Sequence, residues 1–155
     1  MALATMHGGA TVEDTLRNQY LTFVIEDEDY GVEIVYVKEI IKMVPITKVP
    51  HMPRFIEGII NLRGDLIGVL DVRTRFGKPT KEHDEETCII IMSYGEYTLG
   101  IIVDAVQETS NISEENIAPP PNAKLSFANQ FIRNIGKVGD QVKLLLDVER
   151  FLAQD

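Results

Sequence analysis

The feature that most constrains this chain is an internal repeat. Gly31-Val32 recurs 69 positions later as Gly100-Ile101. Further pairs follow in the same order along the two halves: Ile34 with Val103, Val37 with Val106, Glu39 with Glu108, Phe55-Ile56 with Phe131-Ile132, Gly64-Asp65 with Gly139-Asp140, Asp71-Val72 with Asp147-Val148, and Arg75-Phe76 with Arg150-Phe151. Chance readily produces one such match but not an ordered set, so the two halves should share one local fold.

Short β-rich runs separated by turn residues dominate both halves. Strands are predicted over residues 20–25, 30–34, 55–62 and 66–70, and then over 87–92, 97–106, 131–138 and 141–146. Residues 35–42 continue a strand or form a short helix, because their periodicity fits both. Arg63-Gly64-Asp65 joins the first hairpin and Gly139-Asp140 its counterpart, since glycine suits tight turns.

Each half ends in a short predicted helix. The first covers residues 71–76, with Asp71 as its N-cap and Gly77 as its stop. The second covers residues 147–152. Two polar segments, 77–86 and 107–126, are predicted to be a linker and a long loop.

The predicted elements indicate a mostly β fold with two small five-stranded β-barrels and short helices, one of them C-terminal. The barrels should share a core, because each half alone is close to the lower size limit of a stable domain. The domain is expected to span residues 17–153, with approximate halves 17–80 and 86–153. A flexible tail at 1–16, without the regions of a signal peptide, should precede it.

Charge and apolar content narrow the possible functions. The net charge of −9 disfavours binding to nucleic-acid phosphates or anionic lipid headgroups. No apolar run approaches the roughly 18 residues of a membrane span, so direct membrane insertion is not expected. Cys88 is the single cysteine, so no intramolecular disulfide can form. These features together favour a cytoplasmic protein.

Side chains that could support catalysis are scattered. His7, His51 and His83 fall in a tail, a Pro-rich loop and a charged linker, without metal-ligand spacing to other residues. Phosphate-loop and nucleophile-elbow patterns are absent. Asp104 interrupts an apolar run, so it should bond backbone donors or an arginine and serve the architecture. We therefore expect no enzyme activity, no metal and no cofactor.

Residues 53–73 carry the most specific motif in the chain. Asn61-Leu62-Arg63-Gly64, followed by an apolar strand and a helix start at Asp71, resembles the centre of the CheW-like domain family. Other segments resemble that family in the same order: residues 30–34 with 37–40, residues 100–106, and Asp147-Val148. The resemblance covers roughly residues 17–153. It implies two barrels that exchange strands, so that sequence halves need not equal structural halves.

The resemblance implies a chemotaxis adaptor that couples transmembrane chemoreceptors to the histidine kinase CheA. One face would bind the cytoplasmic tip of a receptor helical hairpin, in a groove between the barrels. Another would bind the regulatory domain of CheA. Larger proteins, CheA and CheV, contain the same domain, but the short flanks here favour a stand-alone adaptor, cytoplasmic and recruited to membrane receptor arrays. An adaptor of another chemosensory pathway, such as pilus motility, would look the same.

Arg63 is the first candidate for partner contact, because a guanidinium at a hairpin tip can pair bidentately across an interface. Without the resemblance, an arginine that only fixes the hairpin is the simpler explanation. The resemblance adds five positions used in partner binding: Val37, Glu39, Gly58, Gly100 and Val106. Backbone geometry would explain the two glycines equally well. A weaker candidate for docking on the kinase is the apolar edge formed by Met43, Val44 and Ile46.

Two further classes of function stay open. A small ligand-binding β-barrel would need a pocket with a cluster of perturbed pKa values. A single-strand nucleic-acid-binding barrel is disfavoured by the acidic charge and the absence of tryptophan.

Overall fold

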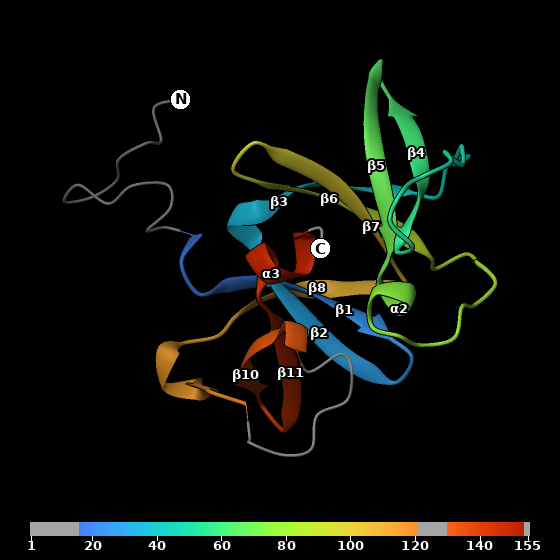
Figure 1. Ribbon diagram of the computed structural model, residues 1–155. Coiled ribbons are helices and arrows are strands. Elements are labelled where there is room, and N and C mark those ends of the chain that lie inside the picture. Colours follow the sequence, from blue (N-terminus) through green and yellow to red (C-terminus); the bar gives the residue numbers. More distant parts are fainter. Residues whose placement is uncertain (1–15, 121–129, 154–155) are drawn as a thin grey trace.

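The computed structural model describes residues 16–120 and 130–153, and these residues form two β-sheets with short helices between them (Figure 1). The first half supplies β1 (Gln19–Ile25), β2 (Glu28–Glu33), the 3-10 helix η3 (Ile34–Tyr36), β3 (Val37–Lys42), β4 (Ile56–Leu62), β5 (Asp65–Asp71) and α2 (Val72–Arg75). The second half supplies β6 (Cys88–Tyr94), β7 (Tyr97–Val103), β8 (Ala105–Asn111), the 3-10 helix η4 (Glu114–Asn116), β9 (Ile117–Ala118), β10 (Ile132–Val138), β11 (Gln141–Leu146) and α3 (Val148–Leu152). The mostly β fold with a C-terminal helix is confirmed.

Both sheets mix strands from the two halves. One has the order β8-β1-β2-β11-β10-β9, and the other the order β3-β6-β7-β5-β4. Strand β3 leaves the first hairpin to pair with β6, and its counterpart β8 returns to pair with β1. This reciprocal exchange is the one that the family resemblance implied. In Figure 1 the β4–β5 hairpin projects from one end of the molecule and β10–β11 from the other.

The repeat extends to the pairing register. Tyr30 pairs with Leu144 in the parallel β2–β11 ladder, and Leu99 pairs with Gly68 in the parallel β7–β5 ladder. The two pairs occupy equivalent places in the repeat, since Tyr30 and Leu99 lie 69 positions apart and Gly68 and Leu144 lie 76 apart. Hydrogen bonds before the helices repeat too, from Asp71 N to Phe55 O at 3.4 Å and from Asp147 N to Phe131 O at 2.8 Å.

The central core draws on both sheets and on α2 and α3. The Phe76 ring packs against Tyr30, Phe131 and Phe151, with centroid distances of 5.2, 5.9 and 5.7 Å. Because strands from each half pack on helices from the other, neither half has a complete core alone. A second cluster lies on the opposite face of the five-stranded sheet and consists of Ile60, Ile67, Val69, Ile89, Ile91 and Ile102.

An aspartate caps the start of each of the two short α-helices, α2 and α3. The Asp71 carboxylate accepts a hydrogen bond from Arg73 N at 2.8 Å, and the Asp147 carboxylate accepts one from Arg150 N at 3.1 Å. Gly77 has φ = 75°, the left-handed conformation in which helices often stop. The predicted start and stop of the first helix are confirmed, and Asp147 caps the second helix in the same way.

The long loop predicted over residues 107–126 is wrong in its first part. Residues 107–111 belong to β8, followed by η4 and β9, while 121–126 lie outside the described residues. Strand β8 is an edge strand, so exposed polar residues are compatible with it, and hydrogen bonds between the Thr22 hydroxyl and the Glu108 backbone fix it to β1. Its pairing partner lies about 85 residues away in sequence, beyond the reach of a local pattern.

Three further predictions need adjustment. Residues 35–42 form neither a continuous strand nor one helix, because η3 is followed by β3. The strand predicted over 97–106 breaks at Asp104, which separates β7 from β8. The six-stranded sheet exceeds the predicted five because the two-residue β9 extends it. Closure of either sheet into a barrel stays a prediction, although Thr47 bridges Ile59 of β4 and brings the chain beyond β3 to the far edge.

Candidate docking surfaces

The tip of the β4–β5 hairpin holds Arg63 in an uncommon conformation. Arg63 and Gly64 have φ values of 52° and 93°, the signs that a two-residue type I′ turn requires. The Asn61 side chain accepts a hydrogen bond from Gly64 N at 2.9 Å and supports the turn. Asn or Gly is the usual occupant of the Arg63 position. Another residue with this positive φ costs about 1 kcal/mol of conformational strain. A strained arginine at an exposed tip points to a role for its side chain.

The Arg63 guanidinium pairs with Glu39, so the structure brings two of the predicted site residues together. Arg63 Nη2, at the turn between β4 and β5, donates to Glu39 Oε2 of β3, the strand at the other edge of the five-stranded sheet. The Arg63 side chain is 68% exposed, which leaves much of its donor fork open to a partner. Glu39 therefore orients the arginine, and an exposed pair of this kind adds at most about 1 kcal/mol of stability.

Leu66 lies beside this pair and was missed by the sequence reasoning. It is 72% exposed, and with Lys38, Ile91 and Thr98 it lines a hollow next to Arg63 and Glu39. An apolar side chain beside an exposed guanidinium is typical of protein-binding surfaces. The sequence signal for an exposed Leu66 was its position just after the turn, paired with the polar Asn61.

The other predicted site residues are mostly tied into the fold. Met43, Val44 and Ile46 are half-buried against the second cluster. A Cβ on Gly58 would lie 2.3 Å from Thr47 O, so the glycine permits the close approach of that segment. Gly100 is buried, and a Cβ there would lie 2.8 Å from Ile89 Cγ2. Val37 and Val106, which are repeat counterparts, pack half-buried against the central core. Direct partner contact by these residues stays a prediction.

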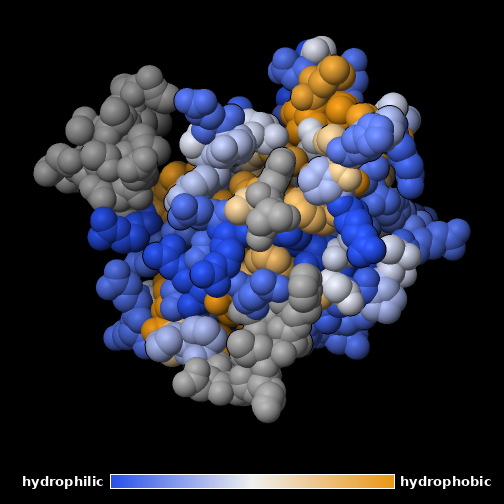
Figure 2. All heavy atoms as spheres, viewed as in Figure 1, coloured by the Kyte–Doolittle hydropathy of each residue, from blue (hydrophilic) through white to orange (hydrophobic). Residues whose placement is uncertain are grey.

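An apolar groove runs between the five-stranded sheet and α3, with a volume of about 680 Å³. Its lining residues are Met52, Ile56, Gly68, Tyr94, Tyr97, Thr98, Leu99, Glu149, Leu152 and Ala153. Tyr97 is 69% exposed at its edge. Figure 2 shows apolar side chains gathered on the same side of the molecule, over the β4–β5 hairpin. A groove was expected from the family resemblance, but its residues could not be named from sequence.

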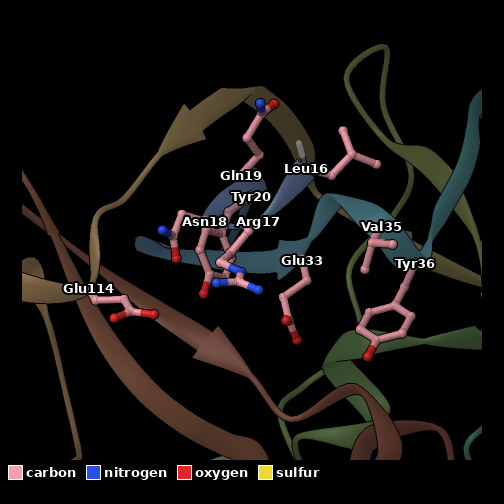
Figure 3. Close-up of a pocket in the computed structure, with 9 residues that line it drawn as sticks. All are labelled: Leu16, Arg17, Asn18, Gln19, Tyr20, Glu33, Val35, Tyr36 and Glu114. Carbon is pink, nitrogen blue, oxygen red and sulfur yellow. The ribbon is translucent and has the colours of Figure 1, made fainter. Parts of the chain in front are cut away.

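A second hollow, of about 460 Å³, lies on the six-stranded sheet and is polar (Figure 3). Arg17, Tyr20, Glu33 and Glu114 are among its lining residues, so it holds charges of both signs. Burial raises the pKa of Glu33, and the positive charge of Arg133 partly opposes this. Burial, with the charge of Glu33, also raises the pKa of Tyr20. This hollow is the feature that a ligand-binding function would use.

Asp104 has the arginine partner expected of it. Its carboxylate accepts hydrogen bonds from Arg73 Nε at 3.0 Å, Arg73 Nη2 at 2.7 Å and Glu26 N at 2.8 Å. Burial alone would raise the pKa of Asp104, but these hydrogen bonds lower it below its usual value. The pair ties α2 to the β1–β2 turn and to the bend between β7 and β8.

Residues 16–120 and 130–153 contain no group of three or more His, Cys, Asp or Glu side chains able to hold a metal ion. Burial raises the pKa of the Cys88 thiol, which disfavours a thiolate nucleophile. No helix among those residues is long and apolar enough to cross a bilayer.

Known proteins resemble this chain over nearly its whole length. The family model described as CheW-like domain matches residues 19–155. The chemotaxis protein CheW of Klebsiella aerogenes is 31% identical over 154 residues, which cover 97% of this chain and 93% of that protein. The chemotaxis protein CheW of Helicobacter pylori is 31% identical over 137 residues, 88% of this chain and 82% of that protein.

A solved structure agrees with both sequence relatives. The scaffolding protein TtCheW of Thermoanaerobacter tengcongensis superposes with a TM-score of 0.81 at 36% identity, covering 89% of this chain and 94% of that one. The exchanged strands, the Asn61–Gly64 hairpin and these matches lead to one assignment. The chain belongs to the CheW-like family of non-catalytic chemotaxis scaffold proteins.

Proposed function

We propose that this protein couples transmembrane chemoreceptors to the histidine kinase CheA, from the cytoplasm and at membrane receptor arrays. The observation that carries the proposal is a pair of surfaces with different chemistry. One is the exposed, charged Arg63–Glu39 pair beside Leu66, and the other is the apolar groove at α3. A scaffold needs two distinct surfaces on one framework. Thr98 lines both hollows, so the two surfaces are neighbouring parts of one framework.

In this proposal the groove receives the tip of a receptor helical hairpin, because its lining is apolar and it lies at the junction of sheet and helix. The hairpin tip with Arg63 and Glu39, and the neighbouring edge of Met43, Val44 and Ile46, contact the regulatory domain of CheA. Val37 and Val106, which support β3 and β8 from the core, affect binding through the positions of those strands. Gly58 and Gly100 act through close packing.

Pull-down of the CheA regulatory domain and of receptor cytoplasmic fragments tests the proposal. Arg63→Ala should weaken binding of at least one partner about tenfold or more, because truncating an arginine at an interface hot spot costs about 2 kcal/mol or more. Arg133→Ala, at an exposed arginine of the other sheet, is the matched control and should bind like wild type. Both variants should unfold within a few degrees of the wild-type temperature, because each removes only one exposed charge.

The outcomes separate two claims. Folded wild-type protein that captures neither partner contradicts the adaptor function. Wild-type binding that Arg63→Ala leaves unchanged contradicts only the role of Arg63. The same assay with the kinase of another chemosensory pathway, such as one for pilus motility, distinguishes the alternative adaptor assignment. Binding of a small molecule in the hollow of Figure 3 would favour the ligand-binding alternative.

A further inference from the structure

The groove at α3 has a single charged residue among the described residues that line it, Glu149. Helix α3 presents Glu149 at the groove, and Glu149 Oε1 accepts a hydrogen bond from the Tyr94 hydroxyl at 3.1 Å. The Tyr94 ring is in turn packed against Tyr36, with a centroid distance of 5.3 Å. The carboxylate is therefore exposed but held in a defined place beside an apolar floor formed by Ile56, Leu99 and Leu152.

We propose that this groove selects an α-helical segment that carries a basic side chain on the edge of its apolar face, and that the basic group pairs with Glu149. The apolar floor fits the i, i+3, i+4 face of a helix. The fixed carboxylate, on a protein of net charge −9, complements a cation and repels an acidic residue at the same place. The inference rests on the proposed adaptor function and adds the chemistry that the receptor segment must carry.

The repeat shows how this groove differs from the counterpart position in the other half. Gly68 and Leu99, which line it, correspond to Leu144 and Tyr30 in the other half. Tyr30 is fully buried there and stacks on Phe23 with a centroid distance of 5.7 Å, and Leu144 packs against the same core. Larger side chains thus fill the equivalent place. We expect one helical segment per adaptor.

Three helical peptides with one apolar face, differing only in a central Lys, Gln or Glu, test the selection. Added to the ¹⁵N-labelled full chain, they should shift the amide signals of Gly68, Thr98 and Leu99. The Lys peptide should bind about three- to tenfold more tightly than the Glu peptide, the range for an exposed to partly desolvated ion pair. The preference should shrink as salt rises from 0.05 to 0.5 M, about a threefold decrease in Debye length.

Variants of Glu149 then test whether this side chain causes the preference for the Lys peptide. Glu149→Gln keeps the shape and the acceptor for Tyr94 and should remove the preference, and Glu149→Arg should reverse it. Glu115→Gln, at an exposed carboxylate of η4, removes the same charge elsewhere and should leave it intact. Gly68→Leu copies the counterpart Leu144. It should weaken the binding of all three peptides equally, because the leucine side chain fills the groove.

Each result is decisive. Equal binding of the three peptides, a preference that survives Glu149→Gln, or no shift at Gly68, Thr98 and Leu99 overturns the inference. So does broadening of those signals with protein concentration alone, which would make a second copy the occupant. If the peptides behave as expected but no receptor fragment binds the wild type, the adaptor function fails and the groove chemistry stands. If a receptor fragment binds wild type and Glu149→Arg equally, only the inference fails.

Discussion

The two sheets share one construction but differ on their outer faces, which face away from the central core. In the five-stranded sheet an apolar cluster covers most of this face. In the six-stranded sheet the repeat counterparts are mixed: Ile102 corresponds to Glu33, Ile67 to Lys143, Ile91 to Thr22 and Ile89 to Tyr20. A buried apolar cluster therefore supports the Arg63 hairpin. The polar counterpart supports the hollow of Figure 3.

The comparison teaches that the repeated framework does not depend on what fills these outer faces. Backbone pairing and the central core are common to both halves, and the outer face is free to diverge. The five-stranded sheet gains stability from its apolar face, whereas the six-stranded sheet must satisfy buried polar groups individually. Substitutions at counterpart positions of the two outer faces should reveal this difference in stability.

The largest effect is expected for Ile102→Glu, which copies Glu33 into the apolar cluster. Ile102 is 3% exposed and has Ile and Val neighbours, so the new carboxylate would have no partner and should cost about 4 kcal/mol or more. Urea unfolding should show the loss as a lower midpoint at an unchanged m value. Ile102→Val, the control, should cost about 1 kcal/mol. Wild-type stability in the glutamate variant would mean that the cluster is wetter than its packing indicates.

The second-largest loss of stability is expected for Lys143→Met in the six-stranded sheet, at the counterpart of Ile67. The Lys143 side chain is 1% exposed, and its Nζ donates to Asp29 at 3.1 Å, Gln141 at 3.1 Å and Gln107 at 3.3 Å. Removing the ammonium group leaves these acceptors without their hydrogen-bond donor, but Asp29 is partly exposed and can bind water instead. The cost should be about 2 kcal/mol, below that of breaking a fully buried pair. The double variant Lys143→Met with Asp29→Asn should recover part of it.

Much of the framework could be predicted from the chain alone, because its signals are local. The hairpin turns, the Asp71 and Asp147 caps and the spacing of the repeat each depend on a few adjacent residues. Asp104 was also predictable, since a carboxylate within an apolar run needs a partner, and Arg73 supplies it. The family motif around Arg63 added the strand exchange, which no local pattern contains.

Features made by distant segments could not be predicted. Strand β8 is polar and depends on β1 for its place. The groove joins Met52, Tyr97 and Leu152, which no sequence spacing relates, and Leu66 is exposed only because the hairpin projects from the sheet. The Arg63–Glu39 pair was predicted as two separate candidates and not as a contact. Such surfaces arise from tertiary packing, so only the folded chain reveals them.

The smallest effect is expected for Glu33→Gln, the reverse of the first exchange in charge. Burial raises the native pKa of Glu33 above its unfolded value, so its ionised form destabilises the fold at neutral pH. Lowering the pH through the raised native pKa protonates Glu33 in the folded state first, and this cost disappears. Glu33→Gln should therefore raise Tm by at most about 2 °C at pH 7, and the gain should fade below about pH 4, where the carboxyl is protonated in both states. Thermal unfolding of both proteins from pH 3.5 to 7.5 measures it. A loss of stability at pH 7 would show that the Glu33 charge is compensated by Arg133, and that the polar face of the six-stranded sheet is as well satisfied as the apolar face opposite.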